Sequence, residues 1–316
     1  MRYVIFIFSL FISQLSIAQD LVEFENGRIA DANDLNRNMQ LLMDEVAELK
    51  GRAAALEIEN CVALSELGDG VLIGDQENQF GINDQLTIAA WIRQTGDCPG
   101  QRCEIVSLEQ TNWAPPESWS SGVALFTKYE EGQPMSLTLR YKYEGGRQTR
   151  VIGYSQDLEI GRWMHVAGVL NPNSVHLFVN GKALDEVTAI SYVDGAWEEL
   201  NFPQGLIDFN GNSLDHSYSW IGRGFPNGLD KPSLEKVFVG SLARLGVWST
   251  ALTANEIRQL YSNTLDVAAS APAGFWPLNE TNGDVAVDLS IGSNNGLLEG
   301  SAMWSESCRN SGISSY

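Results

Sequence analysis

The sequence is poor in basic side chains, histidine and cysteine. Its 316 residues include 20 Lys and Arg against 40 Asp and Glu, with 3 His and 4 Cys, and the net charge is −20 at pH 7. This shortage of positive charge argues against binding to nucleic acid or to an anionic membrane surface, because both are bound through Lys and Arg. So few His and Cys argue against a Cys/His zinc cluster. The hydrophobic content of 44% is ordinary for a globular protein and argues against wholesale disorder.

Long apolar runs are also scarce, and the one present lies at the start of the chain. Residues 1–18 combine Arg2, a mostly apolar stretch, and the small residues Ser16 and Ala18 before Gln19. This pattern predicts a secretory signal peptide, since the run is too short to cross about 30 Å of hydrocarbon comfortably. The alternative is a membrane anchor. We therefore expect an exported chain without a membrane span, either secreted and extracellular or periplasmic.

Export makes the four cysteines candidates for two disulfides. Three pairings are possible. Cys98 and Cys103 are five positions apart with a Pro-Gly turn between them, which favours a small local loop. Cys61 and Cys308 would then pair with each other, and this requires the two ends of the segment 61–308 to lie close together. The alternative is that one or both pairs are free thiols.

A heptad pattern precedes Cys61. Before it, residues 22–29 contain an Asn-Gly pair typical of a short hairpin. The narrow apolar stripe that follows is typical of a coiled coil, so we expect residues 19–60 to hold a hairpin and a helix that joins copies of the chain through residues 30–58. The alternative is a helix packed on its own domain, and the pattern does not decide between a dimer and a trimer. The seam consists of Ala32, Leu35, Met39, Leu42, Val46, Leu49, Ala53 and Leu56.

From Cys61 onward the pattern indicates β-structure. Short apolar or alternating runs are separated by Gly, Asn and Pro, and one capping box, Thr253 with Glu256, predicts a short helix over 253–261. The sequence therefore predicts an all-β fold, a single large antiparallel sandwich. The expected strands are 86–93, 135–141, 163–169, 175–179 (followed by an Asn-Gly hairpin turn), 219–222 and 237–248.

Four motifs in order resemble the laminin-G-like, concanavalin A-like jelly-roll family. The resemblance implies a jelly-roll sandwich over 61–308, followed by a C-terminal tail, 309–316. Residues 19–60 lie outside the resemblance. The motifs are Leu86-Thr-Ile-Ala-Ala-Trp91-Ile; Trp163-Met-His165-Val-Ala with Leu177-Phe-Val-Asn180-Gly181-Lys182; Phe238-Val-Gly240 through Trp248 to Glu256-Ile; and Phe275-Trp276-Pro-Leu278-Asn-Glu280 with Asp288 through Gly296.

The family resemblance implies binding to a glycan or to an extracellular protein, often with calcium. Calcium needs several oxygen ligands, and two Asp- and Asn-rich loops supply candidates. The alternative at each loop is that the side chains bond their own backbone in Asx turns. Where relatives have an Ile-Asp-Glu segment, this chain has Leu242-Ala243-Arg244, which lacks both carboxylates. The candidate calcium ligands are Asp208, Asn210, Asn212 and Asp215 in one loop and Asp288 and Asn294 in the other.

Sugar binding requires aromatic faces outside the core. Trp113 and Trp119 flank a polar, Pro-rich stretch that we interpret as a loop, and Trp197 lies in a similar setting. Exposed tryptophan indicates a contact site. The alternative is that these rings cover the edge of the sandwich.

Familiar catalytic motifs are missing, including E-x-D-x-x-E, H-E-x-x-H and G-x-S-x-G. The expectation is therefore a recognition module and not an enzyme, clustered by the helix. Two alternatives remain open at this point. One is a polysaccharide-active hydrolase or lyase on the same fold, and the other is a purely structural surface component.

Overall fold

The computed structural model describes residues 32–74, 79–98, 102–114, 117–129, 134–143, 147–172, 174–193, 196–199, 216–224, 236–306 and 308. Contacts divide the chain into two compact units, with the boundary between Leu49 and Lys50. The predicted signal peptide (1–18), the hairpin (22–29) and the C-terminal tail (309–316) lie outside the described residues. Neither helix within the described ranges is long and apolar enough to cross a bilayer.

The predicted heptad helix is present as α2, Ala32–Leu56. Its described seam side chains all face solvent. Leu35, Leu42 and Leu49 are 51%, 46% and 46% exposed, while Met39 and Val46 are 54% and 50% exposed. The helix therefore presents its apolar stripe to solvent along the part that precedes Lys50.

The unit that begins at Lys50 contains an eight-stranded antiparallel sheet. The predicted strands 86–93, 163–169, 175–179 and 237–248 all belong to it, and Asn180 and Gly181, with φ of 50° and 75°, form the predicted hairpin turn. In spatial order the strands are β10 (Lys182–Ala183), β9 (Ser174–Val179), β8 (Met164–Asn171), β3 (Leu86–Gln94), β14 (Gly240–Trp248), β1 (Cys61–Leu64) and β18 (Met303–Ser305), with β15 (Gly274–Trp276) paired to β14.

The second sheet has ten antiparallel strands. It contains the predicted strands 135–141 and 219–222. In spatial order the strands are β12 (Ala196–Glu199), β11 (Val187–Val193), β7 (Arg147–Tyr154), β6 (Ser136–Tyr143), β5 (Glu117–Lys128), β4 (Arg102–Ala114), β13 (His216–Ile221), β2 (Gly70–Gly74), β17 (Gly296–Glu299) and β16 (Val285–Ala286).

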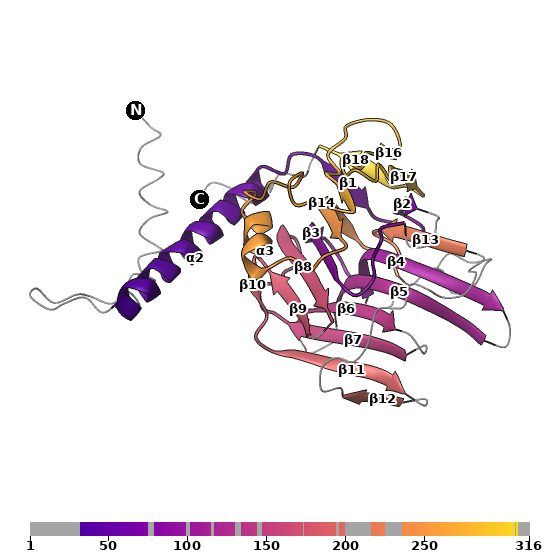
Figure 1. Cartoon of the computed structure of the whole chain (residues 1–316). Helices are drawn as coiled ribbons and strands as arrows, with labels where there is room; N and C mark the ends of the chain where they lie inside the picture. Colours follow the sequence, from indigo (N-terminus) through magenta and orange to yellow (C-terminus); the bar gives the residue numbers. More distant parts are fainter. Residues whose placement is uncertain are drawn as a thin grey trace, which may run out of the picture. The chain divides into compact units, whose positions relative to one another are not determined.

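The two sheets lie face to face and enclose the main core (Figure 1). Alternation along each strand decides which side chains enter it. On β6, Leu137 and Leu139 are fully buried between the sheets. Arg140 alternates with them and points to the face that is turned away from the main core, which we call the second face of the sheet. The structure thus confirms the predicted all-β antiparallel sandwich with a helix before it.

The first and last strands of the sandwich are neighbours, because β1 lies between β14 and β18. Cys61 on β1 is bonded to Cys308, with 6.0 Å between their Cα atoms, and Cys98 is bonded to Cys103. Both pairs are those that the sequence favoured. The Cys61–Cys308 bond joins residues 247 positions apart, and the Cys98–Cys103 bond joins residues five positions apart. The longer loop removes more chain entropy from the unfolded state.

The second face of the eight-stranded sheet is covered as well. Helix α3, Ala254–Tyr261, begins with the predicted capping box and buries Ile257 against Trp248 and Phe178. Next to it, Trp91 of the sheet stacks on Tyr261 at 5.7 Å between ring centroids. The end of α2 completes this second cluster with Ala54 and Ala55.

Gly51 permits the close approach of α2 to this aromatic cluster. A Cβ atom at this position would overlap the ring of Tyr261. The buried positions Gly51, Ala54 and Ala55 lie on one face of the helix, and Ile58, just beyond its end, is buried as well. The seam positions Ala53 and Leu56 lie on the exposed part of the same turns. The last turns of α2 therefore have one face on the sandwich and another face in solvent.

His165 on β8 lies inside the aromatic cluster. Its ring is 5.6 Å from that of Trp91, and burial, followed by the charge of Arg244, lowers its pKa from 6.5 to about 3. The folded protein therefore keeps His165 neutral at pH values where the unfolded chain takes up a proton. Linkage makes the folded state less stable as pH falls from about 6.5 towards 3.

We expect the His165→Gln variant to lose less stability on acidification than the wild type. The wild type should lose about 2 kcal/mol through His165 between pH 6.5 and pH 5, and the variant lacks this contribution. Urea unfolding at a series of pH values measures both slopes. His176→Gln, at an exposed position on β9, is the matched control. Equal slopes for wild type and His165→Gln would contradict the assignment.

Candidate functional sites

Trp113 and Trp119 lie in a β-hairpin and not in the loop that the sequence suggested. Strand β4 continues to Ala114 and β5 begins at Glu117, so only two residues separate the strands. β-propensity and cross-strand pairing extend the ladder further than the polar composition indicates. In the register, Trp113 pairs with Ser118 and Trp119 with Asn112. The side chains of these two residues lie outside the described part.

Trp197 also belongs to a strand. It lies on β12 and pairs with Tyr192 of β11 at the edge of the ten-stranded sheet. The backbone therefore places Trp197 on a different hairpin from Trp113 and Trp119, with β7 and β6 between the two hairpins. Its side chain is likewise outside the described part.

Asp208, Asn210, Asn212 and Asp215 fall outside the described residues. The second candidate calcium loop is described. Both carboxylate oxygens of Asp288 accept hydrogen bonds, from the backbone N–H of Phe275 and Ser290 at 2.8 Å and from that of Asn294 at 2.7 Å. Within the described ranges, no three His, Cys, Asp or Glu side chains are grouped as metal ligands. These contacts of Asp288 are those of the turn that was the alternative, and calcium binding at Asp288 and Asn294 stays a prediction.

The carboxylate of Asp69 also accepts hydrogen bonds from nearby backbone groups. It is fully buried and accepts hydrogen bonds from the backbone of Ser65 and Glu66 and from the backbone and hydroxyl of Ser301. Burial alone would raise the pKa of Asp69, but these hydrogen bonds lower it below its ordinary value. The contacts tie the β1–β2 loop to the C-terminal strands, which is a structural role.

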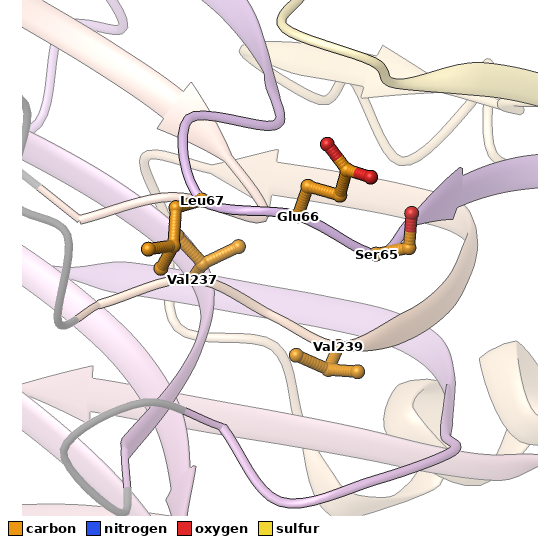
Figure 2. A pocket seen from close by; sticks show the side chains of 5 residues that line it. All are labelled: Ser65, Glu66, Leu67, Val237 and Val239. Carbon is orange, nitrogen blue, oxygen red and sulfur yellow. The ribbon is translucent and has the colours of Figure 1, made fainter.

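A cavity of about 380 Å³ lies beside this loop. Figure 2 shows Ser65, Glu66 and Leu67 on one side and Val237 and Val239 on the other. The volume suits a small ligand. Glu66 is the one charged side chain among the described lining residues, and these do not bring together the converging polar groups that select a sugar.

The second face of the ten-stranded sheet has a different character. It carries the side chains that alternate with the core positions, and several are charged or aromatic. The register aligns Glu104, Phe126 and Thr138 on adjacent strands, and next to them Ala124, Arg140 and Arg150. Arg140 is 7% exposed and Glu104 is fully buried.

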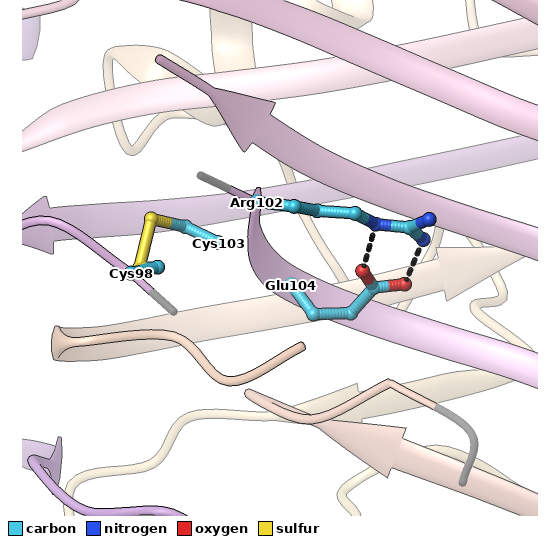
Figure 3. A network of polar contacts seen from close by, with 4 residues as sticks. All are labelled: Cys98, Arg102, Cys103 and Glu104. Carbon is cyan, nitrogen blue, oxygen red and sulfur yellow. Dashed lines mark hydrogen bonds and ion pairs between the residues drawn. A yellow bond between two sulfur atoms is a disulfide. The ribbon is translucent and has the colours of Figure 1, made fainter. Parts of the chain in front are cut away.

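Glu104 and Arg102 form a two-pronged ion pair at the start of β4. Arg102 donates from Nε to Oε2 at 2.6 Å and from Nη2 to Oε1 at 2.7 Å, as Figure 3 shows beside the Cys98–Cys103 disulfide. The guanidinium carbon of Arg102 also lies 3.7 Å from the centre of the Phe126 ring. This fork geometry and the stacking require arginine and fix the orientation of both side chains.

Three more cations lie near this ion pair. We define the cationic cluster as Arg102, Glu104, Arg140, Arg150 and Lys236. Its members carry four positive charges and one negative charge. Burial, and then the charge of Arg102, lowers the pKa of both Arg140 and Arg150. Burial and the same neighbouring charges lower the pKa of Lys236 to about 8.

The sequence does not reveal this cluster, because its members are scattered along the chain. Arg140, Arg150 and Lys236 come from segments that only the strand register brings together. Two local features of the sequence point to members of the cluster. Arg102 and Glu104 are separated by one residue and so face the same side of a strand, and Arg140 occupies a polar position between the core residues Leu139 and Tyr141.

The chain belongs to the concanavalin A-like lectin/glucanases superfamily. The family model matches residues 65–258, which include most strands of both sheets. This match confirms the resemblance found in the four sequence motifs. No functionally curated protein matches the sequence.

Solved structures of similar fold have low sequence identity to this chain. A heptameric pentraxin from Limulus polyphemus is 14% identical, with 64% of this chain and 82% of that chain covered and a TM-score of 0.42. A proposed carbohydrate-binding protein from Bacteroides ovatus is 22% identical, with 77% and 60% covered and a TM-score of 0.45. The enzymatically active domain of tailspike protein 2 from bacteriophage CBA120 is 13% identical, with 68% and 33% covered and a TM-score of 0.39. This chain therefore spans only part of the last two, and no ligand or activity is carried over from any of them.

The expectation that the protein is not an enzyme is wrong, because this fold does not exclude catalysis. The superfamily whose model matches this chain includes glucanases as well as lectins. The missing motifs exclude particular mechanisms only. The fold is compatible with both binding modules and glycan-active enzymes.

We expect Glu104→Gln to destabilise the protein by about 3–5 kcal/mol, because it removes the buried counter-charge of Arg102, whose side chain is itself only 12% exposed. Urea unfolding at pH 7 measures the loss. Glu159→Gln removes a carboxylate from an exposed ion pair with Arg162, and it should cost less than about 1 kcal/mol. If the two variants lose equal stability, Glu104 does not hold the cluster together.

Proposed function

We propose that the protein is an exported module that recognises carbohydrate through one side of its sandwich and is clustered by helix α2. The observation that carries this proposal is the second face of the ten-stranded sheet. Both described helices pack on the other sheet, and this face instead carries charged and aromatic side chains in a superfamily of lectins and glucanases. Sugars are bound by such combinations of flat apolar surface and fixed polar groups.

The tryptophans that the sequence singled out extend this proposal to the ends of the sheet. Trp113 and Trp119 lie on the β4–β5 hairpin and Trp197 on β12, all within the sheet that carries the polar face. We propose that they contact the sugar rings. Two disulfides are consistent with the oxidising compartment that export implies.

A glycan array tests recognition. We expect saturable binding that the double variant Trp113→Ala/Trp119→Ala loses, while Ile291→Ala, at an exposed apolar position outside the strands, keeps it. Running the array with calcium and again with a chelator tests the calcium prediction for residues 208–215. Release of reducing or unsaturated ends from a bound polysaccharide would show that recognition serves catalysis. An array without any specific signal contradicts the proposal.

Clustering rests on the exposed seam of α2. Leu at each d position and Ala, Met or Val at a positions form the stripe that knobs-into-holes packing uses. In a parallel arrangement Glu45 of one copy, at position g, would face Lys50 of the next, at position e, which is a favourable pair. Several weak sugar sites on one assembly bind a polymer more tightly than a single site does.

We expect the wild type to be an oligomer and Leu42→Lys to be a monomer in light scattering at about micromolar concentration. A lysine at the centre of the seam places like charges together in every assembly. The monomer should keep its stability, since Leu42 is 46% exposed in the single chain. Gln40→Lys adds the same charge at an exposed position outside the seam and should remain oligomeric. A monomeric wild type contradicts the clustering proposal.

A further inference from the structure

Aliphatic side chains form an exposed row in the C-terminal part of the sandwich. Val285, Val287, Leu289 and Ile291 are all exposed, and the residues between them are buried. Exposure is greatest at the end of the row, where Leu289 is 65% and Ile291 is 97% exposed beside a tight turn. Turns are ordinarily filled by glycine, proline and small polar residues. We call Leu289 and Ile291 the aliphatic knob.

Hydrogen bonds hold the backbone of this knob in place. The buried Ser290 hydroxyl donates to the Asp288 carboxylate at 2.8 Å and accepts from the backbone N–H of Gly292 at 3.2 Å. The carbonyl of Asn294 accepts a hydrogen bond at 3.0 Å from the indole of Trp276, which is fully buried in the main core. A surface that is already ordered loses little conformational entropy when it binds a partner. The turn thus presents its two aliphatic side chains in a fixed position.

The knob also stands in an uncharged stretch of a strongly acidic chain. Residues 289–298 contain no Asp, Glu, Lys or Arg, although the whole chain has a net charge of −20. Contiguous exposed apolar side chains mark an interaction site. Aliphatic groups do not supply the fixed polar groups that select a sugar, and attraction to an anionic membrane requires Lys or Arg. The knob therefore suits an aliphatic protein surface, including one on another acidic molecule.

The cavity beside the β1–β2 loop has a matching character. Among its described residues, Leu67, Val237 and Val239 supply aliphatic surface, and Ser65 and Glu66 supply polar groups (Figure 2). Its volume of about 380 Å³ exceeds that of an isoleucine side chain. Leu67 is 49% exposed, so part of this aliphatic surface is accessible from solvent. The charges are compatible as well, because the uncharged knob brings no second carboxylate towards Glu66.

We propose that the aliphatic knob of one copy docks into this cavity of a second copy. Such a contact joins two different surfaces, so it is heterologous and either closes a ring or continues as a filament. A knob and a pocket of this size bury less than about 1,200 Å² in total, the range of weak contacts. We expect a dissociation constant between about 10 μM and about 1 mM. This inference goes beyond the proposed function and involves neither the seam of α2 nor the proposed sugar contacts.

Sedimentation of the full chain tests the contact. All variants carry Leu42→Lys, which removes the leucine seam as a second route to association. We expect this background protein to associate as its concentration rises towards about 1 mM. Ile291→Asp and Leu67→Asp should each weaken association at least about tenfold, because each places a carboxylate against aliphatic atoms. Ile160→Asp makes the same change at an exposed isoleucine elsewhere and should associate as the background does.

A mixture of the two variants identifies the surfaces. The Leu67→Asp copy keeps an intact knob and the Ile291→Asp copy keeps an intact cavity, so together they should form a one-to-one complex with the affinity of the background protein. Raising NaCl from about 0.05 M to about 0.5 M should not weaken this complex, since screening reduces the repulsion between acidic copies. Urea unfolding checks that each variant is folded, and Leu67→Ser repeats the test with a milder change.

Four results would overturn the inference. The background protein could stay monomeric up to about 1 mM. Association could be lost in Ile291→Asp but kept in both Leu67 variants, which would mean that the knob binds another surface. Ile291→Asp and Ile160→Asp could have equal effects, which would place the contact elsewhere. The mixed variants could fail to associate. None of these results bears on carbohydrate recognition, and clustering by α2 is judged separately, from the wild type against Leu42→Lys.

Discussion

The eight-stranded sheet is apolar on both faces, and the rest of the molecule depends on covering it. Strand β3 is buried along nearly its whole length, and Trp91 and Trp248 are almost fully buried on the face that points away from the main core. Leaving such surface in water costs about 25 cal/mol per Å². Helix α3 covers one part of this face and the end of α2 covers another. The Cys308 carbonyl completes the cover by accepting a hydrogen bond from the Trp163 indole at 2.7 Å.

This cover explains why α2 carries two apolar stripes. Its last turns contact the sandwich through Gly51, Ala54 and Ala55, small residues that let the helix approach Tyr261. The larger side chains of the heptad seam, including Leu49 and Leu56, remain exposed. A helix whose seam packed on its own sandwich would have no surface left for another copy. The division of the helix into a small-residue face and a leucine face therefore allows docking and association at the same time.

The features that the sequence predicts correctly are those that depend on local residue patterns and on the pairing of cysteines. The alternating strands, the capping box at Thr253 and the closure of the sandwich at Cys61 and Cys308 follow from short-range rules and from four cysteines. The polar, Pro-rich stretch predicts a loop between Trp113 and Trp119, whereas the ladder of β4 and β5 continues through both residues. The cationic cluster depends on which strands become neighbours. No spacing along the chain relates Arg102 to Arg140, and only the folded register does so.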